Sequence, residues 1–137
     1  MKNTIKIALA LLLLINISCK AQQMVLTPLD AYKLKTHEQQ FVNKPLKDLL
    51  KEIKPEIKLV LGTVDYPSYF VFRFISREEL NKKPSGGNTI ALYIYVKEPL
   101  DWHFDQRTKG KEYQWTKEDV EKYGNLTVIR IKVTGKE

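Results

Sequence analysis

Three segments of this chain place an apolar side chain at every second position, and this alternation restricts the fold more than any other feature. They comprise residues 69–76, 89–98 and 126–134. The side chains of a β-strand point alternately to its two faces, so each segment predicts a strand with one core-facing side. The predicted core-facing residues are Phe70, Phe72 and Phe74, then Ile90, Leu92, Ile94 and Val96, and finally Thr127, Ile129, Ile131 and Val133. Residues 57–64 predict a fourth, weaker strand, because Gly62 interrupts the pattern.

One main helix is predicted at residues 43–54. Its apolar stripe has the spacing i, i+3, i+4 and i+7 and consists of Leu46, Leu49, Leu50 and Ile53. Asn43 is the predicted N-cap, and Pro55 prevents the helix from continuing. A second, short helix is predicted from Thr116 to Tyr123, because Thr116 is a favourable cap and two acidic residues occupy the first turn.

The order of these elements, helix, three strands, short helix and strand, indicates the α+β class. Hairpin-length links between the middle strands favour antiparallel pairing, and residues 77–88 are expected to form a charged loop. We therefore expect a two-layer domain, in which an approximately four-stranded, mostly antiparallel sheet carries one main helix packed on one face.

The first 18 residues have the composition of a secretion signal. Lys2 and Lys6 precede an unbroken apolar run at residues 7–15, and a polar segment with small residues follows. The run is shorter than the roughly 20 residues that span a bilayer as a permanent helix. We therefore predict that residues 1–18 direct export and are removed, and that they are no part of the fold.

The end of this segment, Ser18-Cys19, resembles the lipobox of bacterial lipoproteins, in which the cysteine becomes the acylated first residue. The resemblance implies that Cys19 carries a lipid anchor. Cys19 is also the only cysteine of the chain, which favours an attachment role. The alternative is signal-peptidase cleavage after Ala21, where Cys19 and Ala21 form an A-x-A-like frame. The residues that follow indicate no known family.

After the signal, we predict a polar tether at residues 19–35 and a single globular α+β domain at residues 36–137. A lone cysteine has no disulfide partner within the chain, so a hydrophobic core must stabilise the domain. Loss of Lys2 and Lys6 with the signal lowers the net charge from +7 to +5. This balance suits an envelope protein, an anionic polymer or a lipid surface as partner, and export argues against nucleic acid.

The segment 101–105 combines two carboxylates with an imidazole. In an extended backbone Asp101, His103 and Asp105 would share one side, and such a set suits metal ligation or acid/base catalysis. The competing interpretation is a loop that is anchored by its aromatic residues and whose acids face solvent. We favour that interpretation and assign no catalytic residue, metal ligand or cofactor.

The predicted binding residues lie in the same region and are Trp102, His103, Tyr113 and Trp115. Tyr93 and Tyr95 are expected to add to an aromatic-rich surface. Exposed rings stack on sugars or contact a partner protein. The competing interpretation, to which we give more weight, is that the rings cover one sheet face and close the core.

The leading functional hypothesis is a non-enzymatic interaction module of the cell envelope, lipid-anchored, that presents an aromatic and basic surface. The alternative is a small metal-dependent or acid/base hydrolase that uses the loop 101–105. A third hypothesis is an inhibitor that inserts residues 99–115 into an enzyme. Convergence of Asp101, His103 and Asp105 in one pocket would favour the hydrolase, whereas a flat loop would favour binding.

Overall fold

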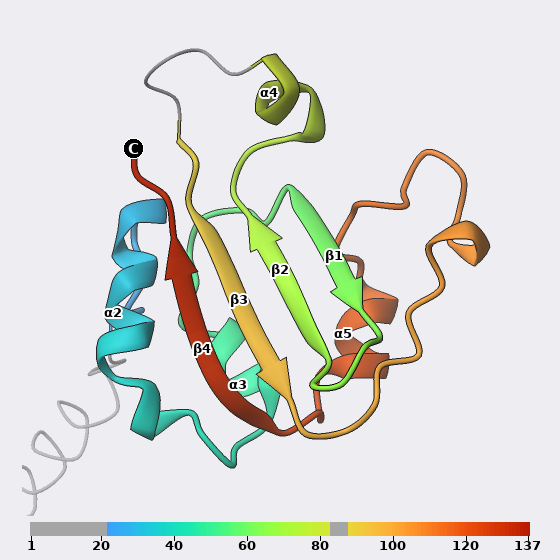
Figure 1. Cartoon of the computed structure of the whole chain (residues 1–137). Helices are drawn as coiled ribbons and strands as arrows, with labels where there is room; N and C mark the ends of the chain where they lie inside the picture. The colour runs from blue at the N-terminus through green and yellow to red at the C-terminus, as the bar shows by residue number, and fades with distance from the viewer. Residues whose placement is uncertain (1–21, 83–87) are drawn as a thin grey trace, which may run out of the picture.

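Figure 1 presents the computed structural model of the chain, which describes residues 22–82 and 88–137. The predicted signal segment, Cys19 and Ala21 lie outside the described residues. Within the part of the chain that is described, no helix has both the length and the apolar character needed to cross a bilayer.

Four antiparallel strands form one sheet and follow each other in chain order. The strands are β1 (Leu59–Thr63), β2 (Tyr69–Arg73), β3 (Ala91–Val96) and β4 (Val128–Thr134). Each lies within a segment that the sequence predicts as a strand, and every neighbouring pair is antiparallel. The α+β class and the four-stranded antiparallel sheet are therefore confirmed.

Helices cover one face of this sheet and leave the other face open. The α-helices are α2 (Ala31–Thr36), α3 (Leu46–Leu50), α4 (Arg77–Lys82) and α5 (Lys117–Tyr123), and short 3-10 helices occupy Pro28–Asp30, Glu38–Gln40 and Phe104–Gln106. In Figure 1, α3 and α5 lie behind the sheet and α2 runs beside β4, while none of the drawn helices crosses the front of the strands. Any ligand of the sheet would therefore meet the front face.

The core lies between the sheet and the helices behind it. The strands β2 and β3, with the residue after β2 and the residue before β3, bury the predicted side chains, which are Phe70, Phe72, Phe74, Ile90, Leu92, Ile94 and Val96. On β4 a register shift beside Val96 puts Val128 and Ile131 in the core, while Ile129 stays half-buried. The predicted core faces of β2 and β3 are confirmed, and the strict alternation predicted from residue 127 to 133 is interrupted by this shift.

The prediction of one main helix is not confirmed, because several short helices are present instead. The helix expected at residues 43–54 is limited to Leu46–Leu50. Asn43 has a φ of 66° and does not cap the helix; Pro45 occupies the cap position in an extended conformation. The apolar stripe is nevertheless used, since Leu46 and Leu49 are fully buried.

Residues 22–35, which we expected to be part of a polar tether, belong to the folded domain. The backbone N–H of Val25 donates to Glu52, and the carbonyl of Val25 accepts from Lys54, both at 2.9 Å. Val25, Ala31 and Leu34 are fully buried. The domain therefore begins before the predicted boundary at residue 36. The sequence did not reveal this, because polar residues lie between the three buried apolar positions.

The helices α5 and α4 both begin with a capping box. Thr116 and Asp119 form a reciprocal capping box, in which each backbone N–H donates to the other's side chain, at 2.9 and 3.2 Å. This confirms the predicted start of the short helix. Ser76 and Glu79 form the same arrangement at 3.2 and 3.1 Å before α4, in the region expected to be a charged loop.

Candidate binding surface

The two tryptophans predicted as binding residues pack against the core. Trp102 is 6% exposed and meets Phe70 edge-on, with ring centroids 5.5 Å apart. Trp115 is partly exposed and lies edge-on to Phe70 and to Phe72, at 5.4 and 5.2 Å. A Cβ atom on Gly62 would lie 2.5 Å from Cγ of Trp102, so the glycine makes room for this ring. These rings close the core, as the competing interpretation of the aromatic region expected.

The other two predicted binding residues remain accessible. Tyr113 is partly exposed and lies between the ring of Phe104, at 5.0 Å, and the guanidinium of Arg77, at 4.7 Å. The side chain of His103 is 54% exposed and contacts Asp101. The predicted lipidation residue, Cys19, lies outside the described residues.

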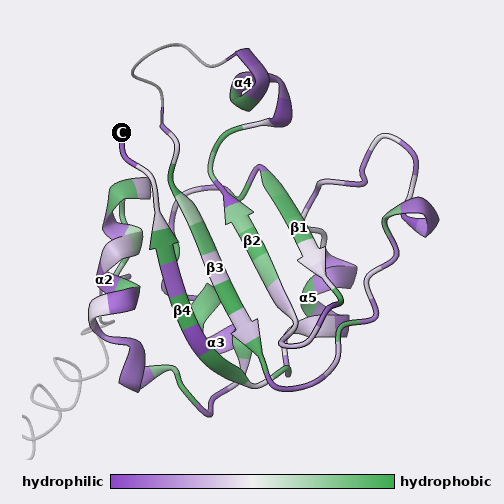
Figure 2. Cartoon of the chain, viewed as in Figure 1, coloured by the Kyte–Doolittle hydropathy of each residue, from purple (hydrophilic) through white to green (hydrophobic). Residues whose placement is uncertain are grey.

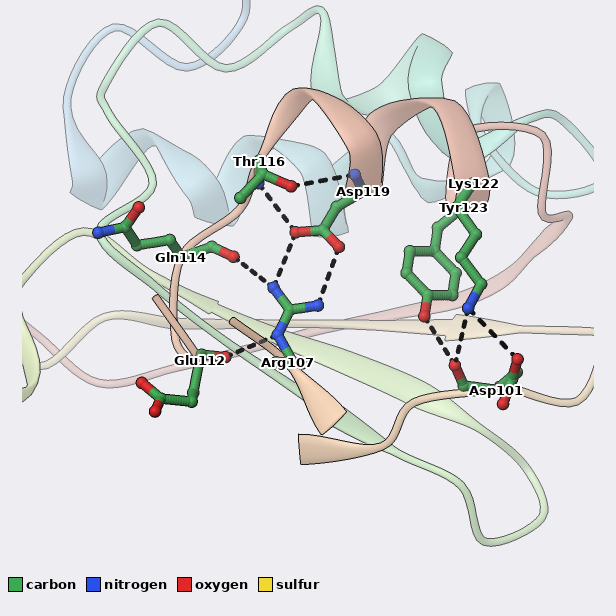
Figure 3. Close-up of polar contacts among 8 residues, drawn as sticks. All are labelled: Asp101, Arg107, Glu112, Gln114, Thr116, Asp119, Lys122 and Tyr123. Atoms are coloured by element: carbon green, nitrogen blue, oxygen red, sulfur yellow. Dashed lines mark hydrogen bonds and ion pairs between the residues drawn. The ribbon is translucent and has the colours of Figure 1, made fainter. Parts of the chain in front are cut away.

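Arg107, which the sequence does not single out, organises the loop at residues 99–115 (Figure 3). Its guanidinium lies 3.9 Å from the centroid of the Trp102 ring and donates to both carboxylate oxygens of Asp119, at 2.9 Å each. It also donates to the backbone carbonyls of Glu112 and Gln114, at 2.9 and 2.7 Å. One side chain therefore holds the loop to α5 and to the core.

The Arg107–Asp119 pair is also visible in the electrostatics of the two groups. Burial by itself would raise the pKa of Asp119, but hydrogen bonds from Arg107 and Thr116 outweigh it and hold this pKa below its ordinary value. The hydrogen bond to Asp119 raises the pKa of Arg107. Both groups are charged in the folded protein, and each is the main partner of the other.

Asp101 and His103 contact each other, but Asp105 does not join them. Oδ1 of Asp101 is 2.6 Å from Nε2 of His103, and Oδ2 is 3.3 Å from Nζ of Lys122. These side chains and that of Tyr123 line an open hollow of about 320 Å³. Asp105 is exposed and lies outside it. The expected triad is therefore a pair that a lysine partly neutralises.

This pairing limits what the hollow can do chemically. The hydrogen bond from Lys122 and its positive charge lower the pKa of Asp101, and a less basic carboxylate is a weaker general base. Among residues 22–82 and 88–137, no group of three or more His, Cys, Asp or Glu side chains is placed to hold a metal ion. The hollow offers an exposed imidazole and a paired carboxylate.

A different group of side chains meets on the open front of the sheet. The register places Tyr69 of β2 opposite Tyr95 of β3, and Tyr95 opposite Arg130 of β4. The ring centroids of Tyr69 and Tyr95 are 4.9 Å apart, and the guanidinium of Arg130 is 5.2 Å from the Tyr95 ring. One row across three strands therefore runs from a cation to two aromatic rings.

The next row also begins with a cation beside a ring, but an aliphatic side chain takes the third place. Val71 lies opposite Tyr93, which lies opposite Lys132, and Nζ of Lys132 is 5.4 Å from the Tyr93 ring. Val71 is only 9% exposed although no described helix covers this side, so neighbouring side chains shield it. At the outer end of the row, Leu61 is 39% exposed. We call Tyr69, Tyr93, Tyr95, Arg130 and Lys132 the tyrosine face.

The open front of the paired strands carries no acidic residue. Its side chains belong to Leu59, Leu61, Thr63, Tyr69, Val71, Arg73, Ala91, Tyr93, Tyr95, Arg130, Lys132 and Thr134, of which Leu59, Val71 and Ala91 are buried. Three of these residues, Arg73, Arg130 and Lys132, are cationic. Figure 2 shows hydrophilic bands along β4, the strand that carries the last two. The sheet therefore presents rings and positive charge together.

Sequence reasoning located part of this surface. Tyr93 and Tyr95 are expected from the sequence to add to an aromatic-rich surface. The alternation predicted at residues 126–134 also puts Arg130 and Lys132 on the side opposite the core-facing residues. Sequence reasoning did not include Tyr69 in this surface, because only the register of β2 against β3 brings it beside Tyr95. The alternation along a strand predicts on which side of the sheet each residue lies, but it does not predict which residue of the next strand lies beside it.

Comparison with known proteins identifies no relative. No protein-family model, curated protein or solved structure matches this chain. The function is therefore inferred from the tyrosine face and from the chemistry of its side chains.

Proposed function

We propose that this protein is an exported, lipid-anchored component of the cell envelope, and that its domain is a non-enzymatic binding module. The tyrosine face is the binding surface. The observation that supports this proposal is the combination of three clustered rings with Arg130 and Lys132 on the one sheet face that the helices leave open. Aromatic rings and arginine are the side chains most enriched where proteins bind partners.

Export and the anchor are supported by the residues before the domain. The apolar run at residues 7–15 and the Ser18-Cys19 pair have the character of a lipoprotein signal. An anchor at Cys19 would hold the domain close to envelope polymers and proteins. A domain so tethered binds through a high local concentration, so even a modest affinity of the tyrosine face would be sufficient.

The test is retention of the purified full chain on isolated cell-wall material, in a Cys19→Ala background that removes any contribution of a lipid. Replacing Tyr95 by Ser and Lys132 by Gln should lower the retained fraction about tenfold, because about 1.4 kcal/mol of binding energy corresponds to that factor. The matched control replaces Val120 by Ser and Lys117 by Gln on α5, where both residues are exposed. Equal retention of both double variants would overturn the proposal.

A hydrolase remains the second candidate, because Asp101 and His103 are in contact inside a hollow. An acid/base role would require His103, so His103→Ala should abolish any hydrolysis of ester, amide or glycoside substrates. A metal-dependent role would predict that zinc or manganese raises the Tm and that His103→Ala removes the increase. Hydrolysis or metal stabilisation that persists in His103→Ala would exclude this site as its source.

A further inference from the structure

We infer that the ligand of the tyrosine face is an acidic glycan, a chain of sugar rings that carries carboxylates. This inference rests on the proposed function and adds the chemistry of the partner. Sugar rings would lie on Tyr95 and Tyr69, and a carboxylate would bind Arg130 or Lys132. The argument combines ring spacing, the availability of the two cations and the charge of the face.

Ring spacing matches a ligand built from successive rings. Neighbouring strands lie about 4.8 Å apart, so a ligand that crosses from β4 to β2 spans about 10 Å. Along this path Arg130, Tyr95 and Tyr69 follow each other at 5.2 and 4.9 Å. Consecutive pyranose rings of a glycan have a similar repeat, so one ring can contact each tyrosine.

Tyrosine suits sugar better than it suits a purely apolar ligand. The phenolic hydroxyl forms hydrogen bonds with sugar hydroxyls, and the apolar part of the ring beside it contacts the C–H groups of a pyranose. Tyr69, Tyr93 and Tyr95 are all partly exposed, and Tyr69 lies within 6.0 Å of both other rings. Tyr69 therefore joins the two rows, because it lies beside Tyr95 in its own row and near Tyr93 in the next one.

Arg130 and Lys132 are available for an anion. Within residues 22–82 and 88–137, neither forms an ion pair, whereas Arg107 is fully engaged by Asp119 and by loop carbonyls. The carboxylate of Glu38 acts on Arg130 electrostatically, but it accepts hydrogen bonds from the Ile131 backbone and from Lys35. The guanidinium of Arg130 thus keeps the planar donor set that binds a carboxylate through two hydrogen bonds.

The charge of the surface selects the acid over a neutral glycan. Its paired strands carry three cations and no carboxylate, so every uronate carboxylate gains attraction and meets no repulsion from these strands. A neutral sugar would use only the rings. A polyanion without rings would use only the cations. The combination predicts that both parts of an acidic glycan contribute.

The experiment is isothermal titration calorimetry of the purified full chain, in the Cys19→Ala background, with oligogalacturonate and with its methyl ester, which has the same rings without the charge. Binding of oligogalacturonate should be at least about tenfold tighter than that of the ester at low salt, and raising the salt to about 1 M should remove the difference. Arg130→Gln should weaken binding of the acid about tenfold and leave the ester unchanged, whereas Tyr95→Leu should weaken both. Lys117→Gln is the charge-matched control and should change neither.

Equal affinity for the ester, equal or tighter binding of polyglutamate or of a single-stranded oligonucleotide, or no binding of oligogalacturonate would each overturn the inference. These outcomes are distinguishable from failure of the proposed function, because retention on cell-wall material is measured separately. If the tyrosine-face variant loses retention while oligogalacturonate does not bind, the face is a binding surface for another partner and the acidic-glycan assignment is wrong.

Discussion

The guanidinium of Arg107 binds the carboxylate of Asp119 through two parallel hydrogen bonds of 2.9 Å each, and their side chains are only 14% and 8% exposed. The same carboxylate accepts the backbone N–H of Thr116, and the same guanidinium lies over Trp102. One ion pair therefore joins the loop at residues 99–115, the start of α5 and the core.

We predict that Arg107→Lys destabilises the domain by about 2 kcal/mol, although it conserves the charge. A lysine can contact Asp119, but it has no planar donor set to bind the two oxygens and the Glu112 and Gln114 carbonyls together, and it stacks less well on Trp102. Urea unfolding of the two proteins measures this difference. Arg77→Lys, on an exposed arginine, is the matched control and should change stability by less than about 0.5 kcal/mol.

Asp119 should make the domain sensitive to acid. Its pKa is lowered in the folded state, so its stabilising contribution is complete above the ordinary value of about 4 and is lost as the pH falls through the lowered value. Asp119→Asn should lower stability at pH 6 and flatten the fall in stability between pH 5 and pH 3 (approximate limits set by the same carboxyl value). Unfolding measured across this range, with Glu118→Gln as control, tests the prediction; an unchanged slope in Asp119→Asn would contradict it.

The strands of this domain were predictable and the loop was not, for a physical reason. Each strand has a local period of two that exists before any partner is known, and Phe70, Phe72 and Phe74 reveal their buried face by sequence alone. The link between Arg107 and Asp119 has no such period. It depends on how residues 107–116 turn back on themselves, and its only local trace is the capping box that begins α5.

The predictions of the helix length at residues 43–54 and of the domain boundary at residue 36 were wrong for a related reason. The apolar stripe at residues 46–53 has helical spacing, yet backbone pairing of Val25 with Glu52 and Lys54 holds the end of this segment in another conformation. Tertiary hydrogen bonds therefore override the local period. The tyrosine face lies between these cases, because each tyrosine's side of the sheet was predictable and their adjacency required the strand register.

Gly62→Ala should destabilise the domain by about 1–3 kcal/mol, the usual cost of overpacking. The added methyl group would lie 2.5 Å from Cγ of Trp102, which is too close for any real contact, and Trp102 is packed against Phe70 and has little freedom to move. Thermal or urea unfolding measures the loss. In a Trp102→Leu background the added methyl group should cost much less, and an equal cost in both backgrounds would show that Trp102 is not the cause.

Glu38 protects the outer edge of the sheet. Its carboxylate accepts the Ile131 backbone N–H of β4 at 2.6 Å and the Lys35 ammonium at 3.0 Å. Glu38→Ala should cost about 1–2 kcal/mol, because it leaves a strand N–H without its acceptor, and it should promote self-association through the uncovered edge. Glu38→Gln keeps an acceptor oxygen and should lose less. Light scattering and urea unfolding report the two effects, and identical behaviour of the two variants would contradict this role.

Cys19 should determine where the protein resides. If its thiol carries the lipid, radiolabelled palmitate labels the wild-type chain, and Cys19→Ala loses both the label and its partition into the membrane fraction. Acyl chains contribute about 0.8 kcal/mol of membrane affinity for each buried CH₂ group, so Cys19→Ala should release the domain from the membrane. The same substitution should leave the described fold unchanged. Ser18→Ala retains a small residue before the cysteine and should still be labelled. A wild-type chain that is exported without label, with its mature end after Ala21, would assign the segment to ordinary signal-peptidase cleavage and leave the tyrosine face to act without a tether.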